Sequence, residues 1–177
     1  MTGPMAHGQF EMRQVVYCAM AAGLAILLAS SLRAAERGPE TNLPLPRFVS
    51  LKTAEGNVRR GPSLSHRIDW VFTRRDMPLQ VVAEHGNWRR VEDRDGVGGW
   101  IHFALLSGVR TVIVDQDMVE LRSRPDPQAG VVAQAEAGVI GRLGACLPEW
   151  CEITAGGEDG WVPKTAIWGV EPGEVRE

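Results

Sequence analysis

The two cysteines Cys146 and Cys151 have the side chains best suited to covalent chemistry in the main body of the sequence. They flank a Leu-Pro-Glu-Trp segment whose length and proline are typical of a hairpin loop. Cysteines that face each other across a hairpin can form a disulfide, which persists in an oxidising compartment. A metal site or a nucleophilic thiol is the alternative, but no histidine follows His102 and Cys-x4-Cys lacks a second pair. We therefore expect a structural disulfide, with no metal and no cofactor.

Ser63 and Ser65 flank His66, which raises the question of a serine hydrolase. Such an enzyme needs a nucleophile turn and an oxyanion-hole loop, and no signature of either accompanies these residues. Hydroxyl side chains beside glycine and proline are typical of turns. The acidic run at residues 92–95 also precedes a glycine, which is ordinary hairpin chemistry rather than a pair of catalytic carboxylates. We therefore expect no enzyme activity.

Six tryptophans against four phenylalanines and one tyrosine suggest stacking surfaces for sugars or peptides. Trp70 and Trp88 are candidates for such a surface and equally for the core. Arg89 and Arg90 follow Trp88 and could bind a carboxylate, although such a pair often only protects a strand edge. The candidate ligand-binding residues are therefore Trp70, Trp88, Arg89 and Arg90.

The tryptophans also reveal an internal repeat, because Trp150 follows Trp88 by 62 residues and Trp161 follows Trp100 by 61. Small barrels fill their interiors with a few large side chains, so we expect Trp100, Trp150 and Trp161 to lie in the cores of the two units.

The cysteine pair has a counterpart in the first unit. There the matching positions fall near Glu84 or His85 and at Arg89, where we expect a weaker cross-strand ion pair.

Short apolar runs position these residues. Residues 48–52, 68–72, 79–83, 88–92 and 100–103 predict strands, and turn residues such as the Asp-Gly at 95–96 separate them. A single helical turn at 104–108 is expected to close the first unit and one at 165–169 the second. No long helical period occurs outside the N-terminal segment, so the fold class is all-β, with two small barrels.

The N-terminal segment differs in composition from the rest. Residues 15–32 are almost free of charge and end near Ala34 and Ala35, which indicates an export signal. The alternative is an uncleaved anchor, because about eighteen apolar residues can span a bilayer. We expect export to the periplasm, with a membrane role only if the segment is retained.

The remaining sequence divides into a linker at residues 36–46, a first unit at 47–108, a second unit at 109–170 and a tail at 171–177. The net charge of −3 gives no reason to expect a nucleic-acid partner. Residues 46–108 hold ten basic and seven acidic side chains, and residues 109–177 hold six and twelve. We interpret this asymmetry as mutual attraction or drift rather than as an anion site.

The motifs resemble those of the bacterial Src-homology-3-like (SH3-like) domain. The first unit has Asn-Val-Arg-Arg-Gly-Pro-Ser at residues 57–63, Trp-Arg-Arg-Val at 88–91 and Gly-Trp-Ile at 99–101. The second unit is degenerate, since it has Glu-Leu-Arg at 120–122 and Arg124 in place of Gly61, but it keeps Gly-Trp-Val at 160–162. The resemblance implies two tandem SH3-like β-barrels after a signal peptide.

The resemblance also implies binding rather than catalysis. We expect an exported binding module that recognises cell-wall peptide, peptidoglycan or an envelope protein. The alternative is a structural accessory, or scaffold, of a periplasmic or membrane protein complex. The Pro-rich ligand mode of eukaryotic relatives uses Tyr-rich grooves and is not expected, because Tyr17 is the only tyrosine.

Overall fold

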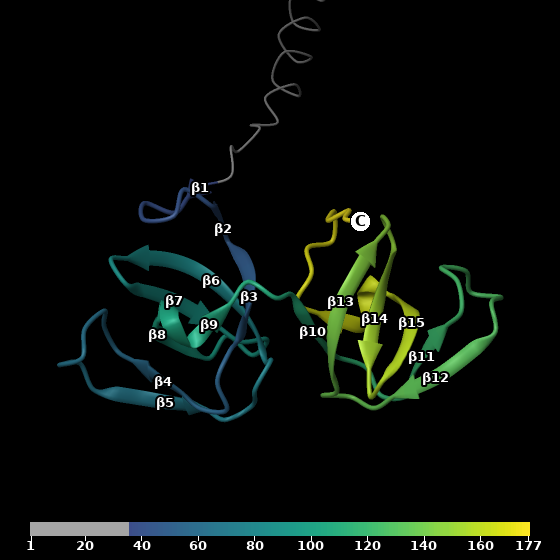
Figure 1. Ribbon diagram of the computed structural model, residues 1–177, viewed down its shortest axis with the longest axis horizontal. Coiled ribbons are helices and arrows are strands. Elements are labelled where there is room, and N and C mark those ends of the chain that lie inside the picture. The colour runs from purple at the N-terminus through teal and green to yellow at the C-terminus, as the bar shows by residue number, and fades with distance from the viewer. Residues whose placement is uncertain (1–35) are drawn as a thin grey trace, which may run out of the picture. The chain divides into compact units, whose positions relative to one another are not determined.

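The computed structural model describes residues 36–177, and the predicted export segment lies outside the described residues. Two antiparallel sheets of seven strands each make up most of the described chain, and a two-stranded hairpin precedes them (Figure 1). No helix of residues 36–177 is both long and apolar enough to cross a membrane. The prediction of an all-β chain with two tandem barrels is confirmed.

The first barrel has the strand order β5-β4-β8-β7-β6-β3-β9. Its elements are β3 (Arg47–Leu51), β4 (Gly56–Arg59), β5 (Ile68–Phe72), β6 (Pro78–His85), β7 (Trp88–Glu92), β8 (Gly98–His102), the 3-10 helix η1 (Phe103–Leu105) and β9 (Leu106–Ser107).

The second barrel repeats this order as β12-β11-β15-β14-β13-β10-β16. Its elements are β10 (Thr111–Val114), β11 (Val119–Arg122), β12 (Val131–Ala135), β13 (Ile140–Cys146), β14 (Trp150–Ala155), β15 (Glu158–Pro163), the 3-10 helix η2 (Lys164–Ala166) and β16 (Ile167–Trp168). Each barrel therefore has a short helical turn near its end, one residue earlier than the predicted starts at 104 and 165, and a two-residue strand follows it.

Aliphatic side chains make up most of the two cores. Ile101 and Val162 are completely buried. Because side chains alternate across a strand, the neighbouring Trp100 and Trp161 point to the outer face and are only partly buried. Trp150 is also only partly buried. The prediction that these three tryptophans lie in the cores was wrong, because the alternation places their smaller neighbours Ile101, Cys151 and Val162 inside.

The segment expected to be a linker forms an ordered hairpin. Strands β1 (Glu36–Arg37) and β2 (Pro44–Leu45) pair with each other, and Leu45 is buried with the first core. Gly38 packs so closely on Glu84 that a Cβ there would lie 2.2 Å from a carboxylate oxygen. Only glycine therefore allows the hairpin to approach the barrel this closely.

The two barrels contact each other through polar and aromatic groups. The Thr111 hydroxyl donates a hydrogen bond of 2.7 Å to the backbone carbonyl of Asp76. The rings of Phe48 and Trp168 meet edge to face, with centroids 5.1 Å apart. Arg94 of the first barrel lies 3.3 Å from the Asp115 carboxylate of the second. This ion pair agrees with the expected attraction between the more basic first unit and the more acidic second unit.

The predicted disulfide between Cys146 and Cys151 is present. The two residues are cross-strand partners of β13 and β14, and both are completely buried. The backbone of Cys146 also exchanges two hydrogen bonds with Arg176, at 2.8 and 3.0 Å. The disulfide therefore lies where the C-terminal tail joins the second barrel.

Reduction of this disulfide should destabilise the second barrel by about 2 kcal/mol, because only a short loop is closed in the unfolded chain. The first barrel should be much less affected. Thermal unfolding of the Cys146→Ser/Cys151→Ser variant measures the loss, and thiol titration of the folded wild-type protein provides the control. Two freely alkylated thiols in the non-reduced protein would contradict the assignment.

Candidate functional site

A hollow on the described surface surrounds Trp150, at the start of β14. It has a volume of about 470 Å³, and β14, η2 and the C-terminal tail contribute to its walls. Four prolines line it: Pro127, Pro148, Pro163 and Pro172. We call this hollow, with Trp150 and its four prolines, the Trp150 groove.

A second hollow of about 400 Å³ adjoins the groove. Pro127, Trp150 and Pro163 line both hollows, so the indole lies between them. The second hollow adds Glu120 and Arg122, which form an ion pair with each other. Together the hollows provide an apolar centre flanked by charged groups, an arrangement common in ligand sites.

The tail that carries Pro172 is held in place by a partly buried ion pair and a buried lysine. Arg110 binds the Glu174 carboxylate through two hydrogen bonds of 2.9 and 3.0 Å. Burial raises the pKa of Glu174, but the bonds from Arg110 outweigh it and lower the pKa below its usual range. The buried Lys164 ammonium donates to the backbone carbonyls of Pro172 and Glu174. The groove is therefore largely preformed.

The matching position of the first barrel is closed. Trp88 pairs across the strands with His102, as Trp150 pairs with Pro163. The His102 imidazole meets the Trp88 ring edge to face, with centroids 5.5 Å apart, and Trp88 is only 9% exposed. The replacement of a histidine by a proline is thus associated with an open groove in the second barrel.

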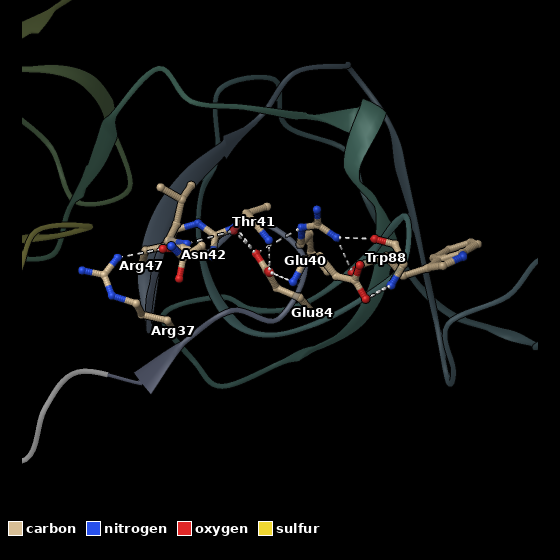
Figure 2. A network of polar contacts seen from close by, with 10 residues as sticks. Arg37, Glu40, Thr41, Asn42, Arg47, Glu84 and Trp88 are labelled. Atoms are coloured by element: carbon tan, nitrogen blue, oxygen red, sulfur yellow. Dashed lines mark hydrogen bonds and ion pairs between the residues drawn. The ribbon is translucent and has the colours of Figure 1, made fainter.

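A buried carboxylate, Glu84, anchors the N-terminal hairpin beside this closed site (Figure 2). It accepts hydrogen bonds from the Glu40 backbone at 3.0 Å, from the Thr41 backbone at 2.9 Å and from the Thr41 hydroxyl at 2.7 Å. Arg47 donates at 2.7 Å, and the Arg89 guanidinium lies 3.5 Å away. Side chains and backbone of three separate segments therefore converge on one carboxylate.

These contacts decide the ionisation of Glu84. Burial raises the pKa of the carboxyl, but the bonds from Thr41, Arg47 and the Glu40 backbone outweigh it and lower the pKa from 4.5 to about 2. The carboxylate is therefore charged in the folded protein at neutral pH.

The predicted ion pair of Glu84 with Arg89 is confirmed. The two residues are cross-strand partners of β6 and β7, as the two cysteines are of β13 and β14. Each cysteine follows its counterpart by 62 residues. At this equivalent position, the first barrel has an ion pair that holds the N-terminal hairpin. The second barrel has a disulfide, which lies beside the C-terminal tail.

The four predicted ligand-binding residues do not form one site. Trp88 is buried, and Arg89 is buried against Glu84. Arg90 is exposed and lines a separate polar hollow of about 360 Å³ with Trp100. Trp70 is 53% exposed on β5, the edge strand of its sheet. A binding role for Trp70 and Arg90 stays a prediction.

The sequence offered a signal for the groove in the proline of the Leu-Pro-Glu-Trp turn. Pro148 and Trp150 lie two residues apart in this turn, whereas Pro127, Pro163 and Pro172 come from distant parts of the chain. Sequence reasoning placed Trp150 in the core and therefore missed the groove.

The serine–histidine group of the first barrel is an exposed turn. The Ser63 hydroxyl lies 3.0 Å from His66 Nδ1 and 2.6 Å from the Ser65 hydroxyl, and it accepts a bond from the Ser65 backbone. This is the turn chemistry that the sequence predicts. Within residues 36–177, no group of three or more His, Cys, Asp or Glu side chains is placed to hold a metal ion.

Two segments of the chain, residues 52–108 and 115–169, match the family described as Bacterial SH3 domain. A similar solved structure is NlpC2 from Trichomonas vaginalis, with 13% identity, a TM-score of 0.33 and coverage of 70% of this chain and 48% of that one. NlpC1 from the same organism has 15% identity, a TM-score of 0.33 and coverage of 78% and 49%. The chain thus spans about half the length of these two structures. No curated protein matches it.

Proposed function

The chain belongs to the bacterial SH3 domain family, and from this premise we propose that it is a non-catalytic binding protein of the cell envelope. Its ligand is a cell-wall peptide, free or as part of peptidoglycan, that lies in the Trp150 groove. The observation that carries the proposal is the partly exposed Trp150 between two hollows, in contrast to the buried Trp88. A rigid aromatic side chain gives a large contact area at a low entropy cost.

The proposed location is the periplasm. The apolar residues 15–32 favour export, and the Cys146–Cys151 disulfide would persist in an oxidising compartment. The absence of catalysis is also part of the proposal. It is supported by the exposed turn around Ser63 and His66, which lacks the features of a nucleophile site.

A second candidate function is that of a scaffold subunit in an envelope protein complex. The edge strands favour it, since β5 and β12 each end a sheet and expose apolar side chains. Trp70 and Val71 are exposed on β5, and Val131 and Val132 on β12. Exposed apolar edges can accept a strand or a flat surface of another protein.

Co-sedimentation with purified peptidoglycan sacculi tests the proposal. The protein lacking residues 1–35 should sediment with sacculi and should be released by soluble peptide fragments of the same material. Crosslinking in cells tests the second candidate. A single crosslinked protein, together with no sedimentation on sacculi, would replace cell-wall binding by the scaffold function.

A further inference from the structure

A cleft with three arginines lies where the two barrels meet. It has a volume of about 680 Å³. Arg74 and Arg75 come from the loop between β5 and β6, and Arg142 comes from β13. Val109 and Ile140 contribute an apolar wall. We call the hollow formed by these residues the arginine cleft; it shares no lining residue with the Trp150 groove.

The cleft is held by bonds to both barrels. Asp76 accepts the hydrogen bond of Thr111 through its backbone carbonyl. Arg74 donates to the backbone carbonyl of Gly138 in the second barrel at 2.8 Å, and Arg75 donates to that of Lys52 in the first at 2.6 Å. These anchors preorganise the loop, which lowers the entropy cost of binding.

The charges in the cleft are unbalanced. Among residues 36–177, no carboxylate lies within ion-pair distance of Arg74, Arg75 or Arg142. Asp76 is the one acidic residue that lines the hollow. By contrast, Arg47 and Arg110 are paired with carboxylates. The cleft therefore keeps a net positive charge and guanidinium N–H groups that can donate to a ligand.

Guanidinium groups bind carboxylates and phosphates, often through two parallel hydrogen bonds. The apolar wall favours a carboxylate over inorganic phosphate. Val109 is 45% exposed beside the arginines, and a bound phosphate ion would leave this side chain in contact with water. A carboxylate next to an aliphatic side chain satisfies both parts of the cleft. We propose that the arginine cleft binds the C-terminal carboxylate of a peptide whose last side chain is aliphatic.

The probe is the tripeptide acetyl-Ala-Ala-Val, titrated by calorimetry and by NMR into the protein lacking residues 1–35. Amide shifts should map to residues 74–76, 109–111 and 139–142. The same peptide with a C-terminal amide should bind at least about tenfold more weakly, the value of one charge-assisted hydrogen bond. Equal binding of acid and amide would overturn the proposal, as would shifts that map elsewhere.

Arg142→Gln should weaken binding of the free acid about tenfold while leaving the melting temperature unchanged, since no described bond depends on this side chain. The matched control is Arg124→Gln, an exposed arginine of the same barrel that does not line the cleft. Equal effects of the two substitutions would contradict a specific site. If inorganic phosphate binds as tightly as the tripeptide, the cleft is a general anion site and the peptide assignment is wrong.

Discussion

Replacing Glu84 by alanine should destabilise the protein by about 3–5 kcal/mol, the usual cost of removing one member of a buried ion pair. The side chain of Glu84 is completely buried, and that of Arg89 is 10% exposed. The substitution leaves Arg89 and Arg47 without their carboxylate, and it removes the acceptor for the backbone N–H groups of Glu40 and Thr41. The N-terminal hairpin should therefore detach before the barrel unfolds.

Chemical unfolding gives the free-energy change, and hydrogen exchange at residues 40–42 reports on the hairpin. The matched control is Glu92→Ala, because Glu92 forms a solvent-accessible pair with Arg90 at 3.7 Å and should cost less than about 1 kcal/mol. If both substitutions cost the same small amount, the carboxylate does not anchor the hairpin.

Acid should weaken the contact between Glu84 and the N-terminal hairpin. The folded pKa of Glu84 is about 2, below the ordinary value of 4.5, so ionised Glu84 stabilises the folded state above pH 4.5. By linkage this difference corresponds to about 3 kcal/mol, which is lost as the pH falls from 4.5 towards 2. Stability of the Glu84→Ala variant should therefore fall less steeply with acid across this range than stability of the wild type. If the stability of both proteins falls equally with pH, the ionised Glu84 does not anchor the hairpin.

The sequence was sufficient for the fold because its signals were local. Alternating strands, glycine turns and a repeat of about 62 residues define two barrels, and a short hairpin brings Cys146 and Cys151 together. Tryptophan positions were harder to predict. Size alone suggested that Trp100 and Trp161 belong in the core, but the inward positions of Ile101 and Val162 exclude them from it.

The binding features depend on tertiary contacts that no local pattern contains. The hairpin at residues 36–45 is polar and contains two prolines, as a linker would, and its bonds to Glu84 together with the burial of Leu45 make it part of the barrel. The Trp150 groove combines prolines from two loops, a strand end and the tail. The degenerate second unit resembles its family less closely, so sequence reasoning placed the ligand in the first unit.

Replacing Trp150 by alanine should weaken binding to sacculi by about 2–4 kcal/mol, or at least thirtyfold, because a central tryptophan often dominates an interface. The indole forms part of both hollows, so its removal merges them and takes away the apolar centre. The second barrel should remain folded, since Trp150 lies partly outside a core built from residues such as Leu143 and Ile153. Sedimentation with sacculi gives the affinity, and thermal unfolding verifies the fold.

Two other tryptophans serve as controls for this experiment. Trp88→Ala should cost about 3–5 kcal/mol of stability, because Trp88 is buried against His102, and any loss of binding should follow that unfolding. Trp70→Ala removes an exposed side chain from the β5 edge, and if the ligand lies in the Trp150 groove it should change neither stability nor binding to sacculi. If Trp70→Ala abolishes binding to sacculi while Trp150→Ala retains it, the ligand lies on the β5 edge strand and not in the Trp150 groove.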